Sequence, residues 1–268
     1  YSSAASDVYK RQLLETLPYP LLTPSEEKSH GANRLNLIGR AQKAPKQPVY
    51  SSQTIAAADT LIQDLSKITH NPGELSLLAQ ELNLQQIYGT VYCAQNVAIT
   101  PLLRALGLSR TGIPRYLNRG RISLETAAWI WGYHPGTPNV VHIDLHRNLR
   151  VNRATARKLG YEIHEVRPIP FDNIKVGTLN VATPLRTLID LLFKVSRTEK
   201  VESLLDDIIF NILEDGEHNG CAPATVQTLL EESKHRRYKN LAKQRLDCLL
   251  QSLYPADSDN ELYPINPS

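Results

Sequence analysis

The sequence predicts an α+β protein with two domains, and three observations lead to this fold class. Residues 54–68 and 74–84 carry apolar side chains at helical spacing. Three segments between residues 139 and 183 have the patterns of strands, and no long helical crossover separates them. Helical patterns then fill most of the chain up to residue 254. We therefore expect a small N-terminal domain, followed by a domain with a mixed or antiparallel sheet and C-terminal helices.

The composition is that of an ordinary globular protein. The chain of 268 residues has a formal net charge of +3, with 41% hydrophobic and 21% charged residues. Its three cysteines, Cys93, Cys221 and Cys248, lie far apart without C-x-x-C spacing, so neither a disulfide framework nor a zinc knuckle is expected. No apolar run reaches the length of a membrane span, and no signal peptide is visible. We expect a cytoplasmic protein with reduced thiols, no membrane contact and no cofactor.

Both ends of the chain are expected to lie outside the folded domains. Met is absent, and residues 1–12 resemble a translated sequencing-adapter artefact, so these residues carry no functional argument. Residues 13–50 contain five prolines and no sustained apolar period, which is typical of a disordered arm. Residues 256–268 form an acidic tail that is expected to fray. The predicted domains are therefore 51–96 and 97–255.

The first predicted domain has the parts of a compressed winged helix. Two helices, over 54–68 and 74–84, are followed by a short strand that Gly89 bends. A neighbouring segment resembles a helix-turn-helix, in which Gly107 lies in the turn and Ser109 caps a second, DNA-reading helix. Pro114 opposes this second interpretation, because it falls where the helix would need its N–H.

Basic residues gather in three stretches of the sequence. No acidic residue stands between Glu81 and Glu125, and a run of one sign makes a local positive field. Two further stretches lie near residues 147–158 and 234–239. Phosphate contact, docking to an acidic protein and a solvated surface are the alternatives. The candidate DNA- or partner-binding residues are Arg104, Arg110, Arg115, Arg119, Arg121, Arg147, Arg150, Arg153, Arg236 and Arg237.

Both tryptophans of the chain lie in one predicted helix, over residues 123–132. Ser123 is a suitable N-cap, and Gly132 is a suitable residue to end the helix. Trp129 and Trp131 are two positions apart and so point to different faces. Either both fill the core, or one covers a second element or meets a partner.

A second helix is predicted from its first residues. Thr183 is a suitable N-cap, and Pro184 suits the first helical position. Apolar residues form a stripe along this helix, and Arg186 and Asp190 are four residues apart and can pair. Alternatively, Asp190 anchors a neighbouring loop by hydrogen bonds.

One predicted strand places His142, Asp144 and His146 on the same face. Imidazole and carboxylate groups can both ligate a metal, and His134 and His164 are further candidate ligands. Alternating polar residues are also expected on the solvent-facing side of a half-buried strand, and no H-E-x-x-H motif is present. We therefore predict no metal site, and keep these residues as the candidates for a metal-dependent enzyme.

Two helical motifs and the strand between them, in this order, resemble a known family. The segments LETAAWIWGYHPGTP (124–138), VVHIDL with the basic turn HRNLR, and VGTLNVATPLRTLIDLL (176–192) resemble the AbiEi-type antitoxins of bacterial type IV toxin–antitoxin (abortive infection) systems, with actinobacterial members most similar. The resemblance covers about residues 97–213. The family motif corresponds to Thr126, Ala127, Ala128, Trp129, Gly132, Thr183, Pro184, Arg186, Thr187 and Asp190, which are expected to form the scaffold of the fold.

The resemblance implies an antitoxin that is also a transcriptional regulator. Its N-terminal domain would bind operator DNA and repress its own operon, and its C-terminal domain would neutralise a nucleotidyltransferase toxin. The sequence contains no phosphate-binding loop, Rossmann glycine pattern or G-x-S-x-G elbow, which agrees with a protein that is not an enzyme. The alternatives are a metal-dependent hydrolase or nuclease, and a protein-interaction module with degenerate DNA binding.

Overall fold

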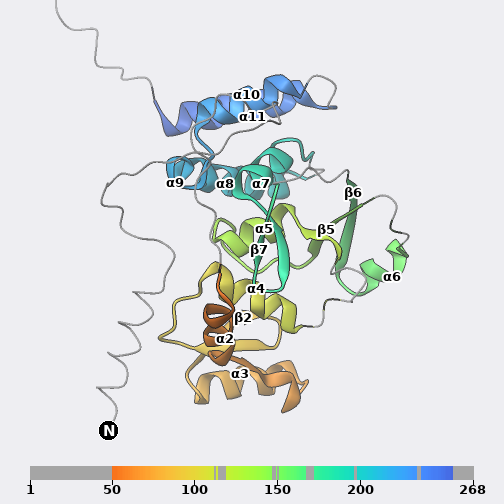
Figure 1. Cartoon of the computed structure of the whole chain (residues 1–268), viewed down its shortest axis with the longest axis vertical. Helices are drawn as coiled ribbons and strands as arrows, with labels where there is room; N and C mark the ends of the chain where they lie inside the picture. The colour runs from red at the N-terminus through yellow and green to blue at the C-terminus, as the bar shows by residue number, and fades with distance from the viewer. Residues whose placement is uncertain are drawn as a thin grey trace, which may run out of the picture.

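The computed structural model describes residues 50–111, 113, 119–146, 149, 151–166, 172–195, 198–233 and 237–255. These residues form an α+β fold with two sheets, one of three antiparallel strands and one of five mixed strands. Figure 1 shows the small sheet with the N-terminal helices at one end of the longest axis, the large sheet in the middle, and the C-terminal helices at the other end. The predicted α+β class and the mixed sheet are thereby confirmed.

The N-terminal unit, residues 50–96, alternates short helices with short strands. Its middle strand β3 pairs antiparallel with both of its neighbours, in the order β1-β3-β2. Gly89 lies in the hairpin between β2 and β3 with φ of 57°, a left-handed conformation that favours glycine. The elements are α2 (Ser52–Thr60), β1 (Ile62–Asp64), the 3-10 helix η1 (Leu65–Lys67), α3 (Pro72–Glu81), β2 (Leu84–Tyr88) and β3 (Val91–Ala94).

The prediction of one helix over residues 54–68 is wrong beyond Thr60. Ile62 pairs with Cys93 in the ladder between β1 and β3, so the chain is extended where its apolar period favours a helix. The Asp64 carboxylate accepts hydrogen bonds from the Ser66 amide and the Thr90 hydroxyl, each at 3.0 Å. Pairing with a strand distant in sequence therefore outweighs the local helical period.

The predicted helix-turn-helix after this unit is also wrong in its first half. Gly107 and Ser109 both lie inside α4 (Pro101–Arg110) rather than in a turn or a cap. A Cβ at Gly107 would lie 2.6 Å from Cγ2 of Ile87, so the glycine allows α4 to approach β2 closely. The Ser109 hydroxyl donates to the Leu106 carbonyl at 2.8 Å. Residue 112 and residues 114–118 of the predicted second helix, including Pro114, lie outside the described residues.

The large sheet has the strand order β6-β5-β4-β8-β7. The pairs β5–β6 and β4–β8 are parallel, whereas β4–β5 and β7–β8 are antiparallel. The short helix α6 (Arg153–Lys158) lies in the crossover between the two parallel strands at the β6 edge. The strands are β4 (Arg121–Ile122), β5 (Val141–His146), β6 (Tyr161–Val166), β7 (Asn173–Val176) and β8 (Leu179–Ala182).

Two helices lie between the large sheet and the C-terminal helices, and the sequence predicted residues at their ends. The Thr183 hydroxyl accepts from the Arg186 amide at 3.1 Å and Pro184 stands at the start of the helix, as predicted. Gly132 ends its helix with φ of 100°, whereas the Ser123 hydroxyl makes no capping hydrogen bond. The helices are α5 (Leu124–Trp131), α7 (Pro184–Leu192), α8 (Glu199–Glu214), α9 (Gly216–Asn219), α10 (Pro223–Glu232) and α11 (Lys239–Leu253).

The main hydrophobic core runs across the predicted domain boundary at residues 96 and 97. Ile87 of β2 belongs to the same buried cluster as Leu102 of α4 and Ile143 of β5. Trp129 is buried in this cluster, and the half-buried Trp131 packs against it while its indole N–H donates to the Ala182 carbonyl at 2.7 Å. Both tryptophans therefore serve the core, which is the simpler of the two predicted alternatives.

A second hydrophobic core lies among the helices on the other side of α5. It contains Ala128 of α5, Leu188 of α7, Leu205 of α8, Val226 of α10 and Leu246 of α11. Helix α5 thus contributes side chains to both cores. No helix in the described part of the chain is both long and apolar enough to cross a membrane.

A buried network of ion pairs joins the strands of the large sheet to α7. Arg121 of β4 donates to the Asp144 carboxylate of β5, with Nη2 at 2.5 Å from Oδ2. Arg186 of α7 pairs with Asp172 at 2.8 Å and, as predicted, with Asp190 at 2.6 Å. Burial alone would lower the pKa of Arg186, but Asp190 and Asp172 outweigh it and raise that pKa. Arg186 therefore remains charged in its largely buried position.

Replacement of Asp144 with alanine should lower the free energy of unfolding by about 3–5 kcal/mol, because the buried Arg121 would lose its hydrogen-bonded carboxylate and keep only the longer pair with Asp172 at 3.9 Å. The matched control is Asp59→Ala, which removes the partner of Arg110 in an exposed pair and should cost about 0–1 kcal/mol. Urea unfolding followed by tryptophan fluorescence measures both values. Equal losses in the two variants would contradict a structural role for the buried network.

Candidate functional site

Two of the five arginines in the acid-free stretch pair with acids from elsewhere in the chain. Arg110 pairs with Asp59 at 2.6 Å, and Arg121 is buried against Asp144. The Arg104 guanidinium donates to the Trp129 carbonyl and lies 5.8 Å from the centre of the Trp129 indole ring. Arg121 therefore does not belong to a binding surface, and burial lowers the pKa of Arg104.

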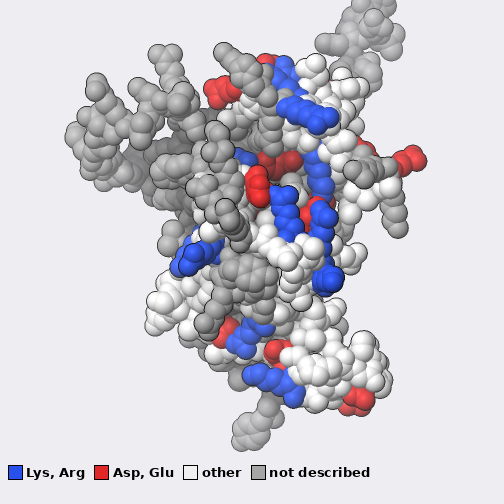
Figure 2. All heavy atoms as spheres, turned by 90° about the vertical axis from the view of Figure 1, so that its right-hand side faces the viewer, with Lys and Arg blue, Asp and Glu red and all other residues white. Residues whose placement is uncertain are grey.

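A second set of the predicted basic residues lies at the surface. Arg119 is exposed, and Arg153 of α6 pairs with Glu165 at 2.7 Å while both side chains remain about half exposed. Helix α6 also carries the exposed Arg157 and Lys158. Figure 2 shows lysine and arginine side chains gathered over the middle of the face that includes the β6 edge in Figure 1, with acidic side chains among them. We name Arg153, Arg157 and Lys158 the α6 basic surface.

The remaining basic candidates divide into one that is described and several that are not. Arg237 lies with its guanidinium 4.6 Å from the centre of the Tyr238 ring, which is a cation–π contact. Arg115, Arg147, Arg150 and Arg236 lie outside the described residues. The α6 basic surface is therefore the clearest cluster among the residues whose positions are known.

The helical part of the first motif of the family resemblance lies inside the folded protein. The Thr126 hydroxyl accepts from the His142 amide at 2.9 Å and donates to the Val140 carbonyl at 3.2 Å, so it ties α5 to β5. Ala127 and Ala128 are fully buried on opposite sides of α5, one in each hydrophobic core. These small residues allow both cores to pack closely against α5.

The second motif lies beside the first. Helix α5 packs against α7, and Lys194, just after α7, forms an ion pair with Glu125 in the first turn of α5. Thr187 is fully buried, and Arg186 and Asp190 belong to the ion-pair network. The two sequence motifs thus form one packed unit, in which their polar side chains contact other parts of the same chain.

The predicted set His142, Asp144 and His146 does not converge on one point. Alternate residues of a strand lie roughly 6.6–6.8 Å apart along it, so their side chains stay separate. His142 and Asp144 are both buried, so the prediction that they face solvent is wrong, and His146 is exposed. The carboxylate of Asp144 is engaged by Arg121.

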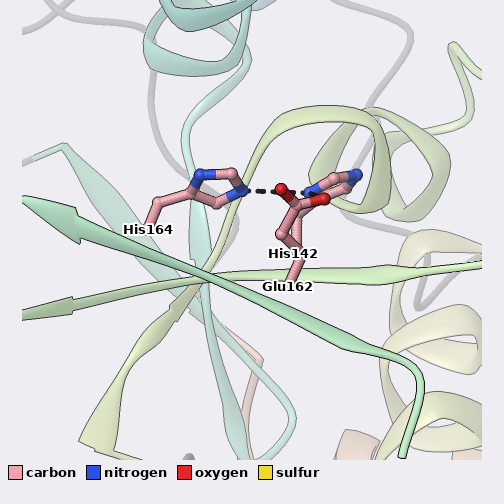
Figure 3. A group of neighbouring side chains, drawn as sticks. All are labelled: His142, Glu162 and His164. Carbon is pink, nitrogen blue, oxygen red and sulfur yellow. Dashed lines mark hydrogen bonds and ion pairs between the residues drawn. The ribbon is translucent and has the colours of Figure 1, made fainter. Parts of the chain in front are cut away.

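His142 instead meets two side chains from the neighbouring strand (Figure 3). In the parallel register, His142 stands opposite Glu162, and Asp144 stands opposite His164. Nδ1 of His142 lies 3.0 Å from Nε2 of His164 and 3.9 Å from Oε2 of Glu162. The sequence indicated His164 as a possible addition, but it missed Glu162, whose only signal is E-x-H spacing on one strand face.

The carboxylate of Glu125 lies near the other ring nitrogen of His142 and belongs to the same group. Oε2 of Glu125 is buried, lies 3.4 Å from Nε2 of His142, and has no hydrogen-bond partner. Burial is the largest influence on His142 and lowers its pKa to about 4, although Glu125 opposes the shift. Burial also acts to raise the pKa of Glu125, but Lys194 and His142 outweigh it and lower that pKa. At neutral pH the group therefore combines a neutral imidazole with an ionised carboxylate.

The two buried cysteines, Cys93 and Cys221, offer no reactive centre in the described structure. Cys93 and Cys221 are buried, and burial raises the pKa of both thiols. Cys248 on α11 is exposed. A buried thiol with a raised pKa is a poor nucleophile, because the thiolate is the reactive form.

Comparison with known proteins leaves the family of the chain open. No protein-family model matches the sequence, and no curated protein matches it. Among solved structures, the fold is similar to the crystal structure of the RV2827C protein from Mycobacterium tuberculosis, over 78% of each chain, with 13% sequence identity and a TM-score of 0.36. A likeness at this level carries no argument about function.

A thiol-reactive dye should modify one cysteine of the native protein, Cys248, and all three cysteines of the unfolded chain. The absorbance of the released dye anion under native and denaturing conditions measures the two stoichiometries. The variant Cys248→Ser is the control, and it should show no rapid reaction in the native state. Rapid modification of a second thiol would mean that Cys93 or Cys221 is accessible in solution.

Proposed function

We propose that the protein is a non-enzymatic binding protein of the AbiEi antitoxin type, whose body neutralises a nucleotidyltransferase toxin. The observation that supports this proposal is the packing of the two resemblance motifs into one unit, with α5 against α7. Trp131 bonds to the Ala182 carbonyl, and Glu125 pairs with Lys194, so contacts cross between the motifs at both ends of α5. If the two segments resembled the family only by chance, nothing would require them to pack against each other.

The α6 basic surface is the proposed contact with the toxin. Arg157 and Lys158 are exposed on α6, which lies at the β6 edge of the large sheet. Exposed charges at the rim of an interface accelerate association with a surface of opposite charge. The proposal therefore requires an acidic surface on the toxin.

We propose further that the N-terminal unit is a variant winged helix that serves protein contact rather than operator binding. Its order of helix, strand, 3-10 helix, helix and hairpin, with β3 between β1 and β2, agrees with a winged helix. Residues 50–96 contain one lysine, no arginine and four carboxylates, a formal net charge of −3. Because phosphate neutralisation supplies most non-specific DNA affinity, this charge opposes DNA binding by the unit.

The surface around α3 agrees with protein contact. A groove of about 820 Å³ lies between α3 and the β2–β3 hairpin, and among the described residues no lysine, arginine or carboxylate lines it. Its lining includes the neutral side chains Gln80, Gln86 and Gln95. Leu77 and Leu82, on and just after α3, are 61% and 53% exposed. Neutral polar and exposed apolar side chains suit a protein surface better than a phosphate backbone.

The metal-dependent hydrolase that uses His142, Asp144 and His146 is not proposed. Asp144 is bonded to Arg121, and the three side chains are spaced along one strand. The distance between them prevents a shared metal ion or a shared substrate atom.

Co-expression of the protein with the product of the adjacent gene tests the toxin proposal. A toxic neighbour should lose its effect on growth when the chain is co-expressed, and the two proteins should co-purify. The double variant Arg157→Glu, Lys158→Glu should weaken the complex by about tenfold or more, because charge reversal places like charges across the interface.

The matched control for this experiment is the double variant Lys67→Glu, Lys175→Glu. It makes the same change in net charge, at exposed residues of the N-terminal unit and of the opposite edge strand β7. Rescue by the control but not by the α6 variant supports the proposed contact. Equal rescue by both variants would exclude the α6 basic surface, and toxicity without rescue would exclude the antitoxin function itself.

Operator binding has its own test. In fluorescence anisotropy, the chain should bind the DNA upstream of its own gene no more tightly than a shuffled duplex of the same length, because the N-terminal unit repels phosphates. The double variant Glu74→Gln, Glu81→Gln, which removes two carboxylates near the ends of α3, should not create a preference for the upstream sequence. Preferential binding that falls steeply with salt would restore the repressor function.

A further inference from the structure

The side chains of His142, Glu162 and His164 form a group whose composition and spacing are those of a metal site. One ligand atom from each residue lies within 4.8 Å of the other two, and no other such group of three occurs among the described residues. Figure 3 shows the two imidazoles and the carboxylate directed to the same side of β5 and β6. The parallel pairing of these strands fixes the backbone positions of all three residues.

Two of the three ligand distances are close to those around a tetrahedral ion, and the third pair, Glu162 with His164, lies within 4.8 Å. With metal–ligand bonds of about 2.0–2.1 Å, neighbouring ligand atoms lie roughly 3.3–3.4 Å apart. The observed separations from His142 Nδ1 are 3.0 Å to His164 Nε2 and 3.9 Å to Glu162 Oε2. Metal binding would require rotation of the partly exposed Glu162 and His164 side chains to bring all three separations to this value.

Glu125 supplies an independent indication that points to a ligand. A metal-bound histidine usually donates its other ring N–H to a carboxylate, which fixes the tautomer and orients the ring. Oε2 of Glu125 lies 3.4 Å from Nε2 of His142, is buried and has no hydrogen-bond partner. If Nε2 of His142 carries the proton, it faces this oxygen, and Nδ1 offers its lone pair to the centre of the group. Lys194 holds the other oxygen of Glu125.

We propose that His142 Nδ1, His164 Nε2 and the Glu162 carboxylate bind one divalent transition-metal ion of the zinc class. Two imidazoles and one carboxylate suit Zn²⁺ better than Mg²⁺ or Ca²⁺, which prefer oxygen ligands. The fourth position is open to water, because the Glu162 side chain is 42% exposed. The ion links β5 to β6 on the face of the sheet opposite α6, so its expected effect is stabilisation of that edge. The site does not depend on the proposed antitoxin function.

Calorimetric titration of the tag-free full chain with Zn²⁺, after removal of metals by a chelator, tests this site. Every protein in the experiment carries Cys248→Ser, because the exposed thiol of Cys248 is a competing ligand. The chain should bind one equivalent of Zn²⁺, and its melting temperature should rise with free Zn²⁺, because the ion binds the folded state. Co²⁺ should bind at the same stoichiometry and give the visible absorption of a tetrahedral site.

Variants of the partly exposed ligands separate this site from adventitious binding. His164→Ala and Glu162→Ala should each abolish the one-equivalent binding, with unchanged circular dichroism. The matched control is His146→Ala, which removes an exposed imidazole from the same strand β5 and should bind as the parent protein does. Glu125→Gln should weaken Zn²⁺ binding by about 10- to 100-fold, since Glu125 orients His142 rather than contacting the ion.

Two results would overturn the proposal. The first is the absence of saturable Zn²⁺ binding to the parent chain. The second is binding by His164→Ala with the affinity of the parent, which would place the ion elsewhere. Neither result bears on toxin neutralisation, which growth rescue measures separately.

Discussion

The ion pairs of Arg121 and Arg186 constrain the placement of β4, β5 and α7. An arginine keeps its charge in the interior, so each guanidinium needs a carboxylate within reach. Arg121 on β4 meets this need through Asp144 on β5, and Arg186 on α7 meets it through Asp172 and Asp190. A shift of β4 by one residue would turn Arg121 to the other face of the sheet and leave Asp144 without its partner. The network therefore fixes both the strand register and the position of α7.

The same need for pairing explains why an acid-free stretch of sequence does not produce an acid-free surface. Arg110 and Arg121 both lie in that stretch, but the fold brings Asp59 and Asp144 to them from positions outside it. Apart from the exposed Arg119, the clearest exposed positive charge lies on α6, where Arg157 and Lys158 follow one another at the β6 edge. Charge read along the chain and charge on the surface thus differ, because pairing depends on distance in space.

The β5–β6 edge carries both of the proposed functional features. Helix α6 connects the two strands and presents basic side chains, and His142, Glu162 and His164 lie on the strands themselves. A metal ion at the three side chains would hold the two strands together on the face of the sheet opposite α6. The N-terminal unit differs from this edge in having a net negative charge, so the two regions suit partners of different chemistry.

The sequence alone determined the elements whose signals are local. The cap at Thr183, the pair Arg186–Asp190 and the end of α5 at Gly132 each depend on residues within one or two helical turns, and all three are observed. Only the tertiary structure decided the strand at residues 62–64 and the group around His142. The first depends on pairing with β3, and the second on the register between β5 and β6. Both require contacts between segments far apart in the chain, and no period or motif within one segment records such contacts.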